Sequence, residues 1–468
     1  MITWPKVTQK SVMLYFLGAL IFLPLGVTYG LMSATHFIMP NWVEGVPFLQ
    51  FGRMRPAHIH FVAFGWLSMV YVGSMFYMIP KMAKVPLWSE KLAQWQAVIH
   101  FFWVWGTVAS IANGITEGRE YAEAPWYMDI LMLLYLWSVA LNAFMTIAHR
   151  KQKKLYVSMW YFTGTLIWFP CVYILGNRIF IHLDGLNDAI ANWFYGHNIL
   201  GLWFTTVGVG ITYYLLPLLI RRPIYSHKLS MIGFWAIALF YAPTGTHHIL
   251  QSPVPYWLKS LAVVSSIGLL VPVLAVMFNF FLTLDKKWPQ AYSNYTLRFL
   301  MTGMFWYLIT CIQGPFQATR WVNWYIHFTQ WVVAHAHAAL LGAFTNISIA
   351  SVYYITPRLV GRPIFNRRAI AWHWWLTTMG FGWFFVALTI AGLVQSAGWR
   401  YGYPIVQWVQ AMYPEQVFRW MGGVMIVTGQ YIFAWNIYRT FFTPAEQDET
   451  ADLPVATAAA TTPTAATA

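Results

Sequence analysis

Six histidines of this sequence lie in long apolar stretches, where an ionisable side chain has little reason to be placed. They are His58, His197, His247, His248, His335 and His337. Ionisable residues in such stretches mark functional sites, and imidazole is a good ligand for copper, zinc and iron. A single histidine of this kind is more often a hydrogen-bonding residue that joins two helices. Six of them indicate bound metal.

One histidine pair is spaced for two separate metal centres. His335 and His337 are about 200° apart around a helix of 3.6 residues per turn, so they face opposite ways and suit different metals.

The other pair is spaced for one metal. His247 and His248 are only about 100° apart, and Pro243 and Gly245 just before them can distort the helix so that both rings converge. With His197 they form a candidate three-histidine site, whose neutral ligands leave an open position for a small molecule.

The rest of the chain predicts an all-α bundle in a membrane. Of its 468 residues, 59% are hydrophobic and only 9% are charged, which is too apolar for a water-soluble globule. Runs of about 20 apolar residues can cross the hydrocarbon as helices. Twelve are present, near 12–36, 57–80, 93–113, 126–148, 156–177, 191–219, 228–251, 258–285, 296–317, 326–356, 370–396 and 418–441.

Two parts of the chain follow from this count. Residues 1–445 form one bundle domain, and residues 446–468 have the Ala/Thr-rich composition of a disordered tail. The first apolar stretch is long enough to span and lacks a small-residue cleavage site, so it is expected to be the first helix and not a signal peptide.

The basic residues predict the orientation. Alternate loops and the chain ends hold 20 of the 28 Lys and Arg residues, so both termini are expected in the cytoplasm. The formal charge of +14 is therefore mainly a topology signal. Because the charges are dispersed through loops, a nucleic-acid partner is not expected.

This topology places all six histidines at one depth, in the outer part of the membrane, as a shared layer of metals requires. His60 faces away from His58 and is expected to be structural. The remaining histidines in segment ends or loops are expected to be interfacial: His36, His100, His149, His182, His227 and His373. Cys171 and Cys311 offer no disulfide framework and no covalent haem attachment, so a c-type haem must sit on a partner.

At these residues the chain resembles the catalytic subunit of the haem-copper oxidase superfamily, and within it the C-family, or cbb-type, oxygen reductases. The similarity runs from about His58 to Arg439 with the expected twelve helices. The strings that carry it are RPAH, EYAE, WFYGHN, YSHKLS, THH and AHAH.

The resemblance implies two b-type haems and one copper. His58 and His337 would be the axial ligands of a low-spin haem. His335 would be the proximal ligand of a high-spin haem. The open face of that haem looks toward copper B, which His197, His247 and His248 would hold. Dioxygen would bind between that iron and the copper.

A tyrosine separates the C-family from its relatives. By resemblance Tyr241, six residues before His247, is the catalytic tyrosine, whereas the A- and B-families carry theirs four residues after the first copper histidine, here Gly201. Nitric oxide reductases share the six histidines but bind non-haem iron, with a glutamate typical at that same place. The sequence favours dioxygen, and nitric oxide reduction to nitrous oxide is the alternative.

The resemblance also assigns roles around the metals. Tyr213 and Ser230 match a proton path from the cytoplasm, and His327 matches another family position whose outer location argues against proton uptake. Glu120 and Glu123 are calcium candidates, and Arg55 and Arg400 are candidates to pair with haem propionates. The string IQGPF has Gln313 where the family usually has Glu.

The expected protein is a multi-pass terminal oxidase subunit of the bacterial cytoplasmic membrane. It would take electrons from a membrane-anchored c-type cytochrome subunit, reduce dioxygen to water, draw protons from the cytoplasm and pump some of them.

Overall fold

The computed structural model describes residue 5 and residues 7–443, and those residues contain helices and no strand. The predicted tail, 446–468, lies outside the described residues.

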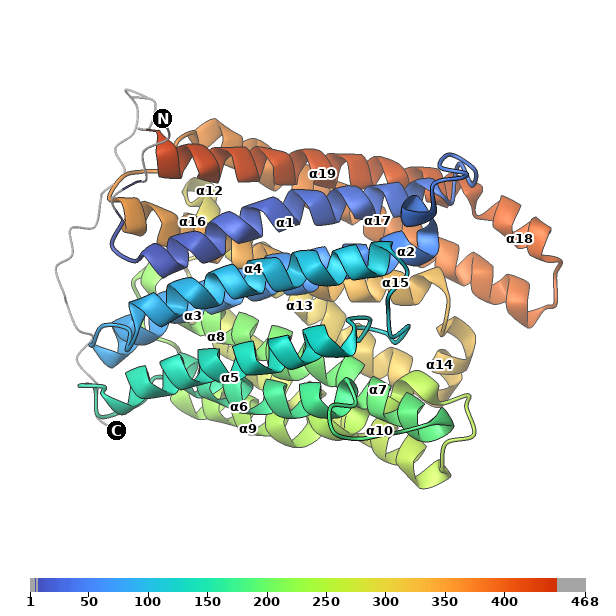
Figure 1. Cartoon of the computed structure of the whole chain (residues 1–468), viewed down its shortest axis with the longest axis horizontal. Coiled ribbons are helices and arrows are strands. Elements are labelled where there is room, and N and C mark those ends of the chain that lie inside the picture. The colour runs from blue at the N-terminus through green and yellow to red at the C-terminus, as the bar shows by residue number, and fades with distance from the viewer. Residues whose placement is uncertain (1–4, 6, 444–468) are drawn as a thin grey trace.

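The described residues form twelve long rods of helix that lie side by side (Figure 1). Each predicted span falls on one rod. The rods are α1 (Lys10–Thr35); α2 (Phe51–Ile59), η2 (His60–Leu67) and α3 (Ser68–Ala83); α4 (Glu90–Ala112); α5 (Trp126–Ala148); α6 (Val157–Gly176); α7 (Gly185–Ile199), η3 (Leu200–Thr205) and α8 (Thr206–Ile220); α9 (His227–Tyr241) and η4 (Ala242–Ile249); α10 (Tyr256–Gly268) and α11 (Leu270–Leu284); α13 (Tyr295–Ala318); α15 (Gln330–His337), η5 (Ala338–Thr345) and α16 (Asn346–Val360); α17 (Arg367–Arg400); and α19 (Tyr413–Phe442).

Ten of these rods are long and apolar enough to cross a membrane, counted over the described residues; α4 and α19 are not among them. Four short helices lie in connections: η1 (Pro47–Leu49), α12 (Gln290–Ser293), α14 (Arg320–Ile326) and α18 (Ile405–Ala411).

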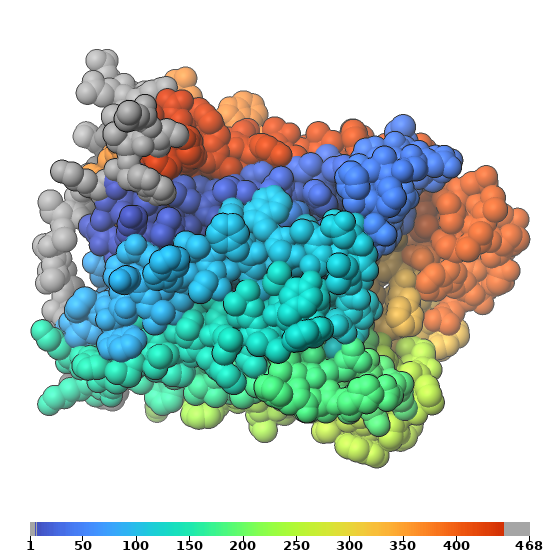
Figure 2. Space-filling view, viewed as in Figure 1, coloured from blue at the N-terminus to red at the C-terminus, as the bar shows by residue number. Residues whose placement is uncertain are grey.

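The bundle has two different ends, which we call the histidine end and the basic end. The histidine end holds α2, α7, α14, α15 and α18, and the basic end holds the loops between α3 and α4, α8 and α9, and α16 and α17 (Figure 1). The first rod begins and the last rod ends at the basic end. On the face drawn in Figure 2, the surface is hollowed at the histidine end, between the blue segment 36–50 and the orange α18.

Three matching hydrogen-bonded clamps fix the helices at the basic end. In each clamp an asparagine side chain accepts from the backbone N–H of the residue that caps a neighbouring, earlier helix and donates to the carbonyl oxygen of that same residue. A threonine one turn later accepts from the N–H of the residue before the cap. The three sets are Ser89 with Asn142 and Thr146, Ser226 with Asn279 and Thr283, and Asn366 with Asn436 and Thr440. Because the clamps satisfy buried backbone groups, they set the rods' mutual heights.

Three rods begin at the histidine end with a helix that carries a histidine, namely α2, α7 and α15, and they share one feature. Within three residues after His58, His197 and His337 the α-helix widens into π-helix, as η2, η3 and η5. Such segments are rare and occur mostly at functional sites. In each of these rods, a π-helical segment therefore separates the histidine-bearing turn from the regular α-helix that follows it.

Two histidines differ from their expected interfacial position. His100 is buried, and its ring bonds the Tyr135 hydroxyl at 2.8 Å and the Phe64 carbonyl oxygen at 2.9 Å. His373 is also buried and bonds the Tyr353 hydroxyl at 3.0 Å. Both join neighbouring rods, a role that periodicity alone does not reveal because the partners lie on other helices.

Candidate functional site

Three histidines converge to form a candidate metal site. One ligand nitrogen from each of His197, His247 and His248 lies within 4.8 Å of the others, the one such group of three among the described residues. His197 Nδ1 and His248 Nε2 are 3.0 Å apart, and the ring centres of His197 and His247 are 4.4 Å apart. Three imidazoles without a carboxylate suit copper, zinc or iron. This confirms the predicted convergence.

The distorted helix that the sequence predicted brings the adjacent pair into this site. The α-helix ends at Tyr241 and continues as the tighter 3₁₀-helix η4, which contains both His247 and His248. At Gly245 an added Cβ would overlap the Trp193 carbonyl oxygen, so only glycine permits this approach to α7. Pro243 and Gly245 thus account for the convergence.

Neighbouring side chains hold the three rings in place. His247 Nδ1 is 2.8 Å from the Ser266 hydroxyl of α10, and the His248 ring stacks on Trp193 with centres 4.1 Å apart. Partners of this kind orient ligand rings and leave the other nitrogen for metal.

Tyr241 lies against the same site, over Gly201. Its ring stacks on His197 with centres 4.9 Å apart and planes 23° apart. A Cβ on Gly201 would overlap Tyr241 Cε1, closer than atoms can come. The tyrosine therefore occupies the space that a side chain at residue 201 would need, and the two positions cannot both carry a large side chain.

The two histidines of the predicted second site also lie together. His58 and His337 face each other with ring centres 6.2 Å apart and planes 18° apart. Because metal–imidazole bonds are about 2 Å long, two rings that bind one ion from opposite sides have centres about 6 Å apart. The His58 Nδ1 lies 2.7 Å from the Gly26 carbonyl oxygen, and the His337 Nδ1 lies 2.8 Å from the Val333 carbonyl oxygen. Both Nε2 atoms are thereby left for a metal.

His335 turns to the other side of its helix, as its spacing predicted. Its Nδ1 is 3.3 Å from Gln313 Oε1 on α13, and it lines the same cavity as the trio and the pair.

That cavity has a volume of about 570 Å³, which is within the range of small-molecule and cofactor sites. Several buried polar atoms in its wall have no hydrogen-bond partner in the described residues, namely His197 Nε2, Gln317 Oε1, His327 Nδ1, Gln330 Oε1 and Arg419 Nε. Since buried polar groups are normally satisfied, these atoms indicate a polar ligand. The Arg419 Nε–H donor suits the propionate of a porphyrin and the His197 Nε2 suits a metal ion, whereas the two amide oxygens need a donor such as water.

Arg419 is a cavity residue that the sequence reasoning missed. It is 8% exposed, its guanidinium lies over the rings of Phe37 and Phe384, and it donates to Gln416 Oε1 at 3.1 Å. Within the described part of the chain, no carboxylate forms an ion pair with Arg419. A buried guanidinium without a counter-charge favours a carboxylate ligand. Its position on α19, far along the chain from the histidines, gave no sequence signal.

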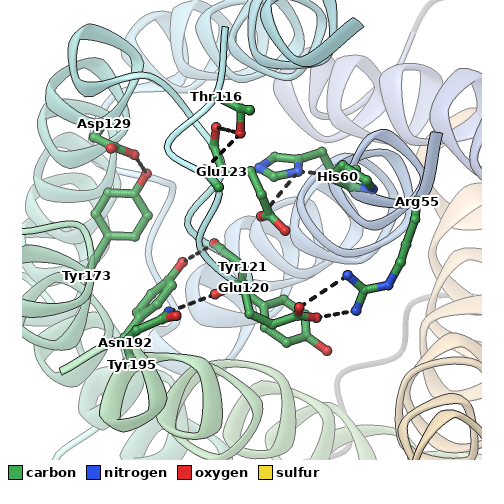
Figure 3. Close-up of polar contacts among 12 residues, drawn as sticks. Arg55, His60, Thr116, Glu120, Tyr121, Glu123, Asp129, Tyr173, Asn192 and Tyr195 are labelled. Carbon is green, nitrogen blue, oxygen red and sulfur yellow. Dashed lines mark hydrogen bonds and ion pairs between the residues drawn. The ribbon is translucent and has the colours of Figure 1, made fainter. Parts of the chain in front are cut away.

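The two predicted propionate arginines differ. Arg55 lines the cavity but its guanidinium pairs with Glu120, at 2.6 and 3.2 Å (Figure 3). Arg400 does not belong to the described lining and stacks on Trp324 at 3.9 Å.

The two calcium candidates lie in one loop but face different partners (Figure 3). Glu120 faces Arg55, whereas Glu123 is buried with Oε2 3.9 Å from His60 Nδ1. Burial raises the pKa of the Glu123 carboxyl to about 8. Neither carboxylate joins a group of three close ligand atoms in the described part of the chain.

The predicted proton-path residues are both buried at the basic end. The Tyr213 hydroxyl accepts from Asn279 Nδ2 at 3.3 Å, so one of the three clamps reaches this tyrosine. The Ser230 hydroxyl donates to the His227 carbonyl oxygen of its own helix at 2.7 Å. Asn279 was missed because asparagine in an apolar helix is a weak signal. His327, by contrast, lies in the cavity wall beside His248, with ring centres 6.3 Å apart.

Comparisons with known proteins agree with this geometry. The family model for cytochrome c and quinol oxidase polypeptide I matches residues 10–460. The chain is 31% identical over 452 residues to the cbb3-type cytochrome c oxidase subunit CcoN1 of Stutzerimonas stutzeri, covering 92% of this chain and 94% of that protein.

Two proteins of lower sequence identity are also similar to the chain. A nitric oxide reductase subunit of Stutzerimonas stutzeri is 26% identical over 407 residues, covering 81% of this chain and 83% of that protein. A cryo-EM structure of a heme-copper terminal oxidase dimer shares the fold with a TM-score of 0.78 at 17% identity, covering 95% of this chain and 86% of that one.

The match of the family model over nearly the whole chain and the similarity to a cbb3-type subunit agree with the converged histidines. The chain belongs to the cytochrome c and quinol oxidase polypeptide I family and is an oxidoreductase subunit of the haem-copper oxidases.

Proposed function

We propose that the chain is the catalytic subunit of a bacterial respiratory oxidase that reduces dioxygen to water at a high-spin haem b and a copper ion. The observation that carries this proposal is the trio of His197, His247 and His248, with ligand atoms within 4.8 Å of one another, in one cavity with His335.

The histidines divide into three tasks. His58 and His337 would hold a low-spin haem b, which would supply electron transfer. His335 holds a high-spin haem b from one side, and the trio holds copper. When bound, these metals supply the electrons that cleave the O–O bond.

Tyr241 supports dioxygen over nitric oxide as the substrate. Its hydroxyl holds a proton beside the trio, and its ring stacks on His197. A glutamate ligand for non-haem iron would need residue 201, where Tyr241 leaves no room for a side chain. The similarity to a nitric oxide reductase subunit favours nitric oxide reduction at a haem b and non-haem iron as the second candidate.

The polar residues around the cavity have supporting roles. Arg419 and Arg55 bind haem propionates, and Arg400 is the weaker candidate because it lies on Trp324. Glu120 and Glu123 hold calcium. To bind the ion, the Glu120 carboxylate leaves its ion pair with Arg55. Tyr213 and Ser230 carry protons from the basic end toward Tyr241, with Asn279 orienting Tyr213.

The surroundings follow from this role. The basic end faces the cytoplasm, the described ends of the chain are cytoplasmic, and the bundle lies among lipids in the bacterial inner membrane. A membrane-anchored c-type cytochrome subunit delivers electrons at the histidine end, and proton uptake is coupled to pumping.

Metal analysis of the purified complex tests the proposal. After subtraction of the partners' c-type haem iron, we expect one copper and two irons per chain, with dioxygen consumption. Three irons per chain, no copper and nitric oxide turnover would establish the second candidate instead.

A further inference from the structure

The His335 ring has its hydrogen-bond partner on another helix, as several histidines of this chain do and four do not. Four histidines direct Nδ1 at the carbonyl oxygen of the residue four positions earlier in their own helix, at 2.7–3.2 Å: His36, His60, His149 and His337. The His335 Nδ1 instead faces Gln313 Oε1 on α13, at 3.3 Å. A residue on a different helix therefore orients this ring.

The backbone of α13 is close to the ring at this point. A Cβ added to Gly314 would lie 3.8 Å from His335 Cε1, and Pro315 follows within the helix. Because an amide oxygen only accepts, the proton of His335 lies on Nδ1 and its lone pair on Nε2. The contact between α13 and α15 thereby leaves the Nε2 of His335 as the nitrogen that can bind a metal.

The chemistry of the partner sets how strongly that nitrogen donates. A carboxylate facing Nδ1–H would draw the proton toward itself and make the imidazole a stronger donor. The amide of Gln313 is neutral, and its contact is longer than the 2.7 and 2.8 Å contacts that His58 and His337 make with backbone carbonyls. His335 is thus held as a weakly polarised, neutral imidazole.

We propose that Gln313 is the positioning residue for His335, and that its uncharged amide keeps the iron–histidine bond of the high-spin haem weak and the haem's reduction potential high. This inference rests on the proposed function, because it requires haem at His335. The axial ligand's basicity and its outer hydrogen bond are the levers by which a protein tunes haem iron.

The experiment compares three variants of the purified complex by resonance Raman spectroscopy of the ferrous form and by redox titration. Gln313→Glu is expected to raise the iron–histidine stretching frequency and to lower the potential of the high-spin haem. Gln313→Leu, which removes the acceptor, is expected to lower the frequency and broaden the band. Gln317→Glu adds the same charge to α13 within the cavity wall but one turn away from the His335 contact.

The matched control separates bonding from charge. Gln317→Glu is expected to lower the potential without moving the iron–histidine band. If the band stays in place in Gln313→Glu and Gln313→Leu, or moves as far in Gln317→Glu, the inference is wrong although the proposed function stands. A wild-type protein that shows no high-spin haem would overturn the proposed function itself, and the inference with it.

Discussion

The facing pair and the converging trio are built differently. The rings of His58 and His337 are held at 6.2 Å by backbone carbonyls, which no substitution of a side chain removes. In the trio, His247 relies on the Ser266 hydroxyl, His248 on the Trp193 ring and His197 on the Tyr241 ring. In the proposed function the pair is a closed site for one metal, whereas the trio keeps a side exposed to the cavity and depends on replaceable neighbours.

The difference teaches where each site is vulnerable. A backbone partner fixes ligand geometry wherever the helices are in place, so the pair follows from the fold. Side-chain partners allow a site to be tuned, so the trio follows from individual residues. We therefore expect substitutions around the trio to alter chemistry while the pair persists.

The largest effect is expected from removing one ligand of each site. His248→Ala should lose copper and dioxygen turnover while both haem spectra remain, because the two other imidazoles cannot complete the site. His58→Ala should lose the low-spin haem spectrum and retain copper. Metal analysis and optical spectra of both variants check this. Loss of both signals in either variant would show that the two sites are not independent.

A smaller but severe effect is expected from Gly201→Ala. The added Cβ would overlap the Tyr241 ring, so the tyrosine must move. Displacing a catalytic group by about 1 Å can cost about 10²-fold in rate, and we expect turnover to fall by that order. The control is Gly382→Ala, where an added Cβ meets no atom within 4 Å. Oxygen consumption that is equal in the two variants would remove Tyr241 from the account.

Some of the features on which these expectations depend could be predicted from the sequence, and others could not. The twelve rods, the convergence of His247 and His248, and the opposed directions of His335 and His337 were predicted because hydropathy and helical periodicity act locally. The clamp at Asn279, the cavity position of Arg419 and the burial of His100 were not predicted. Each of these depends on a partner on a distant helix, and spacing along one helix carries no information about it.

A moderate effect is expected at the partner of His247. Ser266→Ala removes the hydroxyl 2.8 Å from Nδ1, and loss of such a partner typically costs about 10–100-fold in metal affinity. Copper retention during dialysis against a chelator measures this. Ser260→Ala is the control, at a half-buried hydroxyl on the same helix that bonds Arg320 and the Tyr256 carbonyl oxygen instead of a histidine. Equal copper retention in both variants would contradict the side-chain dependence of the trio.

The smallest effect concerns the outer loop. Burial raises the pKa of Glu123 to about 8, above the value of about 4.3 in an unfolded chain. A raised carboxyl pKa means that the folded state binds the proton more tightly, so its contribution to stability is present at low pH and is lost as pH rises through about 8.

Glu123→Gln should therefore be more stable than the wild type at pH 9 and similar at pH 4, as measured by thermal unfolding. Because the proposed calcium site includes the Glu123 carboxylate, added calcium should stabilise the wild type at pH 9 and not the variant. Parallel pH profiles for both proteins would show that Glu123 does not titrate in this way.

Anomalous X-ray diffraction at the iron and copper absorption edges tests the central claim most directly, because it locates each metal separately. The account predicts one copper peak among His197, His247 and His248, one iron peak between His58 and His337, and one iron peak at His335. An iron peak in place of copper within the trio, or no peak there, would contradict it.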